Sequence, residues 1–174
     1  MHYALNEPFT TLNTTPLGHE SFHIARKAHG YCVGIDTHGK LQWGEAEFDN
    51  QALLIITDEE CPKSYHDTLT KQGISWIATG KNGINLARAM EMLAENFGVE
   101  RLAITGGGHI NGAFLEAGLL DEVSYMVAPG IDGRKGMVAV FDGIADNSRP
   151  ATQLHLESVK QMGETVWMRY KFKH

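Results

Sequence analysis

Three consecutive glycines, Gly106, Gly107 and Gly108, stand between an apolar stretch and a segment that favours a short helix. Glycine leaves its backbone N–H uncovered, and the N–H groups at a helix N-terminus attract anions such as phosphate. The segment is not G-x-G-x-x-G, because Asn111 takes the last position, and it is not a P-loop, because no Gly-Lys-Ser/Thr follows. One glycine would be enough for a tight turn. We therefore expect nucleotide binding here, with a positive-φ turn as the alternative.

A second loop, Thr79 to Gly83, also follows an expected strand and precedes an expected helix. Ligands of open α/β sheets collect outside the carboxyl ends of the strands. We therefore expect this loop, the pair Thr57-Asp58 and the triple glycine to line one crevice. Lys81 would offer a cation to a phosphate there, and a solvated loop lysine is an equally good interpretation.

The segment from His19 to His23 matches the pattern H-E-x-x-H, and His29 stands at the spacing of a third zinc ligand. On a helix, the first two histidines would lie one turn apart, and Glu20 would act as general base toward a zinc-bound water. However, Arg26 replaces the glycine that lets the chain turn in such proteases. The chain has 9 histidines, which makes a chance match reasonable. We rank a zinc hydrolase last and expect no bound metal.

Strand and helix patterns alternate through the middle of the chain, and these elements would position the loops. Apolar runs predict strands at residues 31–36, 52–57, 74–79, 102–105 and 122–128, and helices are expected at residues 62–72, 86–97 and 111–117. Residues 154–159 and 166–172 predict a closing antiparallel hairpin. Right-handed β-α-β units give a mostly parallel sheet covered on both faces. We expect residues 1–30 to be an irregular lead-in and residues 31–174 to form one α/β domain.

The longest of these helices has the clearest limits. Its apolar residues recur at helical spacing from Leu86 to Phe97. The sequence predicts Asn85 as the N-cap that precedes them and Gly98 as the C-cap that follows.

The composition of the chain argues against several functional classes of protein. The chain has 174 residues, with 15 Lys and Arg against 21 Asp and Glu, so a broad nucleic-acid-binding face is not expected. Neither Cys32 nor Cys61 stands in a metal-ligand or nucleophile pattern, so we expect reduced thiols and no covalent catalysis. The sequence shows no secretory leader and no apolar run long enough for a membrane span. A soluble, cytoplasmic protein is therefore expected.

The segment from Thr105 through Gly118-Leu119-Leu120-Asp121-Glu122 and Ala128-Pro129 to Gly133 resembles the reductase domain of riboflavin biosynthesis. That domain is the C-terminal half of the bifunctional deaminase-reductase. The resemblance extends from about Tyr31 to the C-terminus and includes Ile35-Asp36 with Gly39-Lys40-Leu41. It implies a dihydrofolate-reductase-like α/β fold, in which a mostly parallel central sheet is flanked by helices and a C-terminal antiparallel β-hairpin closes the domain.

The resemblance also implies an activity. NADPH would donate a hydride to the ribosyl C1′ of a 5-amino-6-ribosylamino-pyrimidine phosphate, or to a related pyrimidine or pterin, and the enzyme would be a homodimer. No catalytic residue is assigned. Asp36 and Lys40 follow a strand near the expected crevice and are candidates for substrate binding, with a turn aspartate and a surface lysine as the alternatives. The expected cofactor-binding residues are Thr57, Gly80, Thr105, Gly106, Gly107, Gly108, His109 and Ile110.

Two departures from the family pattern support a second hypothesis. Thr105 stands where many members carry glutamate, which removes a carboxylate that could hydrogen-bond substrate hydroxyls. The family also begins with a strand, a helix and a second strand that have no counterpart in residues 1–30. The sheet edge left open would be covered by residues 1–30 or by a second chain. The alternative function is a non-catalytic NADPH-binding or nucleotide-binding domain of the same fold.

Overall fold

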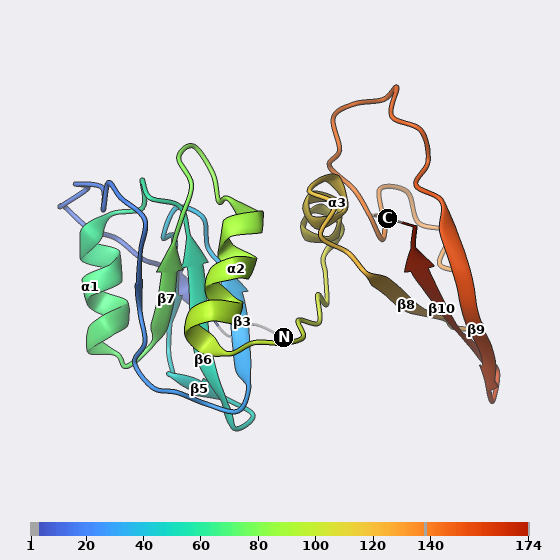
Figure 1. The fold of residues 1–174 in the computed structure, drawn as a ribbon, viewed down its shortest axis with the longest axis horizontal. Helices are drawn as coiled ribbons and strands as arrows, with labels where there is room; N and C mark the ends of the chain where they lie inside the picture. Colours follow the sequence, from blue (N-terminus) through green and yellow to red (C-terminus); the bar gives the residue numbers. More distant parts are fainter. Residues whose placement is uncertain (1–3, 138, 174) are drawn as a thin grey trace. The chain divides into compact units, whose positions relative to one another are not determined.

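The computed structural model describes residues 4–137 and 139–173 and divides into two compact units, with the boundary between Leu102 and Ala103 (Figure 1). This boundary falls inside the single domain expected for residues 31–174. No sheet of the described residues extends across this boundary. Within the described residues, no helix is both long enough and apolar enough to cross a membrane.

The first unit is built around a mixed sheet in the order β2-β7-β6-β3. Strands β3, β6 and β7 run parallel, β2 is antiparallel to β7, and β5 is antiparallel to the start of β6. A separate antiparallel pair joins β1 and β4. The strands are β1 (Ala4–Pro8), β2 (Ser21–His23), β3 (Tyr31–Ile35), β4 (Leu41–Trp43), β5 (Glu47–Phe48), β6 (Gln51–Thr57) and β7 (Ser75–Ala78), and the helices are α1 (Lys63–Lys71) and α2 (Leu86–Phe97).

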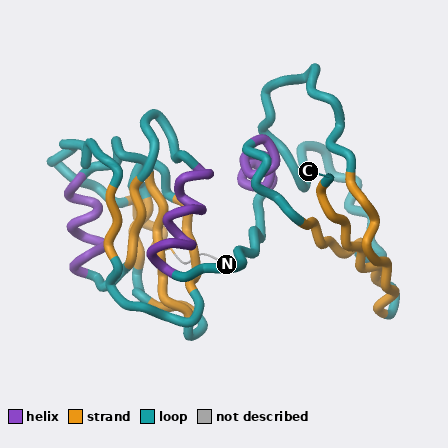
Figure 2. Tube along the Cα trace, in the orientation of Figure 1, coloured by secondary structure: helices purple, strands orange, loops and turns teal. Residues whose placement is uncertain are grey.

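Alternate side chains of β6 build two cores, one on each face of the sheet. Ile55 packs with Tyr65 of α1, and Ile56 packs with Leu93 of α2. Successive residues of a strand point to opposite faces, so a run of buried apolar residues is typical of a strand covered on both sides. Figure 2 shows the two helices on opposite sides of these strands. The sheet therefore holds the carboxyl ends of β3, β6 and β7 at one edge.

The limits of α2 confirm the predicted caps. The Asn85 side chain accepts a hydrogen bond from the Arg88 N–H, 3.1 Å away, which satisfies one N–H that has no partner within the helix. Gly98 ends the helix at φ +69°, in the left-handed region that favours glycine.

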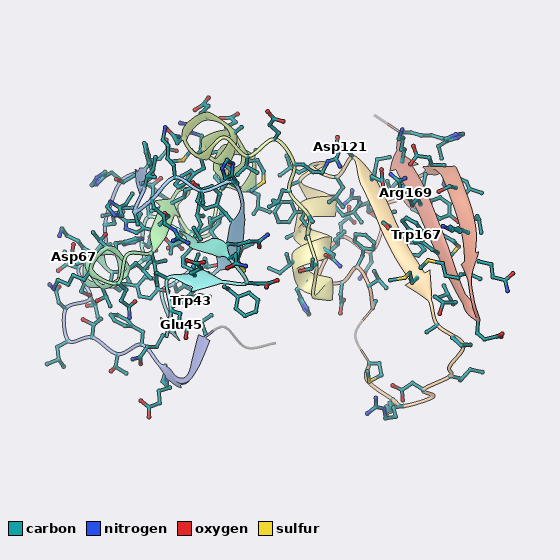
Figure 3. The ribbon with its side chains drawn as sticks, turned by 90° about the horizontal axis from the view of Figure 1, so that it is seen from below. Trp43, Glu45, Asp67, Asp121, Trp167 and Arg169 are labelled. Atoms are coloured by element: carbon teal, nitrogen blue, oxygen red, sulfur yellow. The ribbon has the colours of Figure 1, made fainter. Side chains whose placement is uncertain are left out.

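The second unit contains one helix and one antiparallel sheet. Its elements are α3 (Gly108–Glu116), β8 (Glu122–Val127), β9 (Leu154–Met162) and β10 (Thr165–Phe172), and β10 lies between β8 and β9. On one face of β10, Trp167 donates a hydrogen bond to Ser124 (2.8 Å), and Arg169 donates two to Glu122 (both 2.8 Å; Figure 3). The other face of β10 carries the apolar residues of the alternating pattern.

Three expectations about the elements were wrong. The lead-in is not irregular throughout, because β1 and β2 both lie before residue 31. The sheet of the first unit is mixed rather than mostly parallel, and that of the second is antiparallel. Residues 102–105 form no strand. A strand needs a neighbour for its backbone hydrogen bonds, and none of the described strands pairs with these residues.

Candidate functional site

The first unit brings Asp36, Thr57 and Gly80 to the same edge of its sheet. Backbone hydrogen bonds join the ends of the three parallel strands: Asp36 N–H donates to Ile56 (3.0 Å), and Thr79 N–H donates to Thr57 (3.1 Å). A further bond joins Glu59 N–H to Gly80 (2.9 Å). The carboxyl ends of these three strands therefore lie together at one edge, as the parallel pattern predicts, and a crevice at this edge stays a prediction.

The Thr57 side chain forms its hydrogen bonds within the first unit. It is fully buried, its hydroxyl donates to the Asp58 carbonyl (3.1 Å), and it lies 2.9 Å from Nε2 of the buried His66. The sequence motif placed Thr57 at the edge correctly, but the hydroxyl already has partners. Its contact with a cofactor stays a prediction.

Burial of His66 has a consequence for stability. Burial lowers the pKa of this imidazole from 6.5 to about 4, because the charged form would lose its hydration. Between pH 6.5 and about pH 4, the His66 imidazole is therefore protonated in the unfolded chain but neutral in the folded chain. The free energy of unfolding should fall by about 3 kcal/mol as the pH drops through this window, and this contribution should level off below it.

Urea unfolding across that pH range, compared between the native chain and His66→Gln, isolates this contribution. Glutamine keeps a hydrogen-bonding group beside Thr57 but does not titrate. The native chain should lose more stability than the variant on acidification. Parallel stability curves for the two proteins would show that His66 is not held neutral by the fold.

Asp36 positions the turn between β3 and β4. Its carboxylate accepts hydrogen bonds from the N–H groups of Lys40 (3.0 Å) and Leu41 (2.8 Å) and from the Tyr65 hydroxyl (2.7 Å). Trp43 Nε1 in turn donates to Tyr65 (2.7 Å). Burial, together with the bond to Asp36, raises the pKa of Tyr65 and keeps the phenol neutral. Asp36 therefore stabilises the turn and its contact with α1. Lys40 is exposed. A role of either residue in binding substrate stays a prediction.

Gly80 is required by the shape of its own loop. Its φ is +90°, and a Cβ at this position would overlap with the Asn85 N–H and the Gly83 carbonyl. Lys81 is exposed in the same loop. The fold alone explains this glycine, so its absence of a side chain does not by itself indicate a ligand.

Two acidic residues, Asp58 and Glu59, follow directly after β6. Asp58 is fully buried, and neither of its side-chain oxygens accepts a hydrogen bond from another described residue; His38 Nδ1 lies 3.2 Å from Oδ2. Glu59 Oε1 accepts a hydrogen bond from Gly80 N–H at 3.1 Å. Sequence reasoning did not single out Glu59, although the run Asp58-Glu59-Glu60 directly after β6 was a visible signal.

The H-E-x-x-H interpretation fails on geometry. Ser21 to His23 form strand β2, so His19 and His23 do not lie one turn apart on a helix. Glu20 accepts hydrogen bonds from Thr79 Oγ1 (3.0 Å) and Arg88 Nε (3.1 Å) and thus links β2 to β7 and α2. Among the described residues, no three potential metal ligands cluster together.

Cys61 is buried, and its thiol is held in the protonated form. Burial and the nearby carboxylates of Asp36 and Asp58 raise its pKa to about 12. A thiol with so high a pKa carries almost no thiolate at neutral pH, and the thiolate is the nucleophile.

In the second unit, the glycine loop leads into the N-terminus of α3. Gly106 has φ +105°, and Gly107 is the N-cap in extended conformation, with no side-chain hydrogen bond and no acidic residue in the first turn. A Cβ on Gly107 would meet nothing within 4 Å. The first N–H groups of a helix have no partner inside it. An anion such as a pyrophosphate would satisfy them, so this part of the loop fits the expected ligand.

Gly108 and Gly112 serve a different purpose. A Cβ on Gly108 would overlap with the Ala139 carbonyl, and one on Gly112 would overlap with the Asp142 carbonyl. Asp142 N–H donates to the Gly108 carbonyl (3.0 Å), and Asn111 Nδ2 donates to the Val140 carbonyl (2.8 Å). The segment 139–142 therefore lies directly against α3, so the third glycine of the loop is explained by packing.

The expected cofactor residues divide between the units. Thr57 and Gly80 lie in the first unit, and Thr105 to Ile110 lie in the second. That all of them line one crevice stays a prediction. The first unit also has a cavity of about 230 Å³ on the α1 side, which contains none of these residues; its lining includes Phe9, Trp43, Tyr65, Leu69 and Gln72.

Residues 35–168 match the family described as the RibD C-terminal domain. The chain belongs to this family. It is 29% identical over 126 residues to a 2,5-diamino-6-ribosylamino-4(3H)-pyrimidinone 5′-phosphate reductase of Methanothermobacter thermautotrophicus, covering 72% of this chain and 57% of the relative. It is 27% identical over 101 residues to the riboflavin biosynthesis protein RibD of Bacillus amyloliquefaciens, covering 58% of this chain and 27% of that protein.

Solved structures show the same RibD-type fold at lower sequence identity. A pyrimidine reductase-like protein of Corynebacterium diphtheriae gives a TM-score of 0.64 at 19% identity, over 82% of this chain and 60% of that one. Acinetobacter baumannii RibD gives a TM-score of 0.59 at 18% identity, and the match covers 81% of this chain and 37% of that one. The chain spans little more than half the length of the first curated relative and about a quarter of the second.

Proposed function

We propose that the chain is an oxidoreductase of riboflavin biosynthesis that reduces a ribosylamino-pyrimidine phosphate with a reduced nicotinamide dinucleotide, for which the family resemblance implies NADPH. Membership of the RibD C-terminal domain family supports the reaction class, and the names of the curated relatives support the substrate class. The observation that carries the proposal is the N-terminus of α3, which has no side-chain cap and begins at Gly107, where a Cβ would meet nothing within 4 Å.

The residues of this chain would bind and orient the two ligands. First-turn N–H groups of α3 would donate to the pyrophosphate, and the absence of side chains on Gly106 and Gly107 would give it room. When bound, the reduced nicotinamide supplies the hydride. The proposal includes a dihydrofolate-reductase-like arrangement of the whole domain, a homodimer and a cytoplasmic location.

A non-catalytic dinucleotide-binding domain is the second candidate, favoured by one feature. Residues 105–111 contain no carboxylate, and Thr105 stands before the glycines. A substrate hydroxyl at this position would therefore find a threonine hydroxyl in place of a charged acceptor.

Turnover separates the two candidates. The chain is mixed with NADPH or NADH and with the 5-amino-6-ribosylamino-pyrimidine phosphate, and oxidation of the dinucleotide and formation of the ribityl product are followed together. Substrate-dependent oxidation is the expected result. Binding of the dinucleotide without product would support the non-catalytic domain, and absence of binding would contradict both.

A further inference from the structure

The cavity on the α1 side of the first unit is separate from the residues expected to bind cofactor or substrate. Its volume is about 230 Å³, and all nine residues that line it belong to the first unit. They come from three segments, which are the residues after β1, strand β4 and helix α1. None of the nine is a residue that the sequence predicts for the cofactor or the substrate. The cavity is therefore a second candidate site, independent of the proposed reductase chemistry.

Aromatic rings of fixed orientation form part of the cavity wall. Trp43 is 6% exposed and Tyr65 is 1% exposed. The Trp43 indole donates to the Tyr65 hydroxyl (2.7 Å), which donates to Asp36 (2.7 Å), so the polar atoms of both rings already have partners. Phe9 packs edge-on against Tyr65, with ring centroids 5.0 Å apart and planes at 71°. A wall of this kind favours another aromatic ring.

Helix α1 lines the cavity with one stripe of side chains. The stripe has the i, i+3, i+4, i+7 spacing of a single helix face and consists of Tyr65, Thr68, Leu69 and Gln72. The Thr68 hydroxyl donates to a backbone carbonyl of α1 (2.9 Å). Gln72 Nε2 donates to the Trp43 carbonyl (3.2 Å), whereas Gln72 Oε1 accepts no hydrogen bond from any described group. One amide oxygen beside the cavity can therefore accept a hydrogen bond from a ligand.

The charge and the size of the cavity limit what it can bind. None of the lining residues is charged, although 21% of the residues of the chain are. An ion would lose hydration on entering and would gain no opposite charge, which is strongly unfavourable. An apolar cavity of about 150 Å³ can hold benzene. A cavity of about 230 Å³ therefore has room for two fused rings, but it is smaller than the ~300 Å³ at which sites for drug-sized ligands begin.

We infer that this cavity binds a neutral aromatic molecule of one or two fused rings that carries a hydrogen-bond donor. The ring packs against Phe9, Trp43 and Tyr65, and the donor bonds to Oε1 of Gln72. Because such a ligand joins β4 to α1 and binds only the folded chain, it also stabilises the first unit.

Isothermal titration calorimetry of the full chain with indole and with benzofuran tests the inference. The two probes have nearly the same size and shape, but only indole has an N–H donor. Indole should bind with a dissociation constant of roughly 100 μM, and benzofuran should bind about fivefold more weakly, as expected for the loss of one hydrogen bond. Gln72→Met keeps the length of the side chain but removes the acceptor, so this variant should bind the two probes equally.

Leu41→Trp is designed to fill the cavity, and Leu12→Trp is the matched control. Leu41 lines the cavity and is 38% exposed, so a larger ring can enter the cavity without displacing the buried core. Leu12 is fully exposed and is not part of the lining. Indole binding should weaken about tenfold or more in Leu41→Trp, because the added ring takes the place of the ligand, and should be unchanged in Leu12→Trp.

Three results would overturn the inference. They are absence of indole binding, equal affinity of the native chain for the two probes, and indole binding that Leu41→Trp leaves unchanged, which would be adventitious binding elsewhere. The proposed reductase would be unaffected by all three, because it is tested separately by turnover with a dinucleotide.

Discussion

Replacing Gly112 by alanine should destabilise the second unit by about 2 to 3 kcal/mol, as overpacking of a close contact does. The added Cβ would overlap with the carbonyl oxygen of Asp142, which is backbone and cannot rotate away. Alanine favours a helix interior over glycine by about 1 kcal/mol, so the steric cost must exceed that gain. The same segment is anchored by the hydrogen bond from Asp142 N–H to Gly108, and this bond should be strained by the displacement.

Hydrogen exchange of peptides from α3 and from β8 to β10 measures this loss within the unit itself. Gly107→Ala is the matched control, because its Cβ would meet nothing within 4 Å. Exchange in Gly112→Ala should accelerate in the second unit, while Gly107→Ala should behave like the native chain. Equal protection in both variants would mean that segment 139–142 does not pack against α3 in solution.

Gly107→Val should abolish most dinucleotide binding and leave the fold intact. The isopropyl group would stand at the N-cap of α3, over the N–H groups proposed to hold the pyrophosphate. Gly107 has φ −70° and ψ −170°, an extended conformation that valine adopts readily. Loss of two or three charge-assisted hydrogen bonds should weaken binding by roughly 100-fold.

Titration of the Gly107→Val variant with NADH and NADPH measures the loss of affinity, and circular dichroism shows whether the fold is retained. Gly30→Val serves as control, because a Cβ there touches only the flexible Gln51 side chain, at 3.5 Å, and the residue lies at the amino end of β3. The control should bind as the native chain does. Unchanged affinity in Gly107→Val would place the cofactor elsewhere.

The elements that the sequence predicted well are those with strong local patterns. Strands β3, β6 and β7 are apolar runs, and β6 is buried on both faces. Helix α2 combines helical spacing with an Asn85 cap and a Gly98 end, so its limits could be placed closely. Because parallel strands align their carboxyl ends, the grouping of Thr57 with Gly80 also followed from the pattern.

The features that sequence reasoning missed depend on partners distant in the chain. β1 and β2 are short and carry no sustained apolar pattern, and they form because β4 and β7 provide strands with which they can pair. The apolar residues 102–105 favour a strand but have no pairing neighbour among the described strands. The packing role of Gly112 is set by its contact with residue 142, and this contact has no local signal in the sequence.

The central claim, that the glycine loop binds a dinucleotide pyrophosphate, is tested most directly by amide NMR of the isotopically labelled chain during titration with NADH. The account predicts saturable shifts of the backbone N–H resonances of Gly107, Gly108, His109 and Ile110, with a matching shift of the phosphorus signals of the pyrophosphate. Saturable binding that leaves these four resonances unmoved would contradict it.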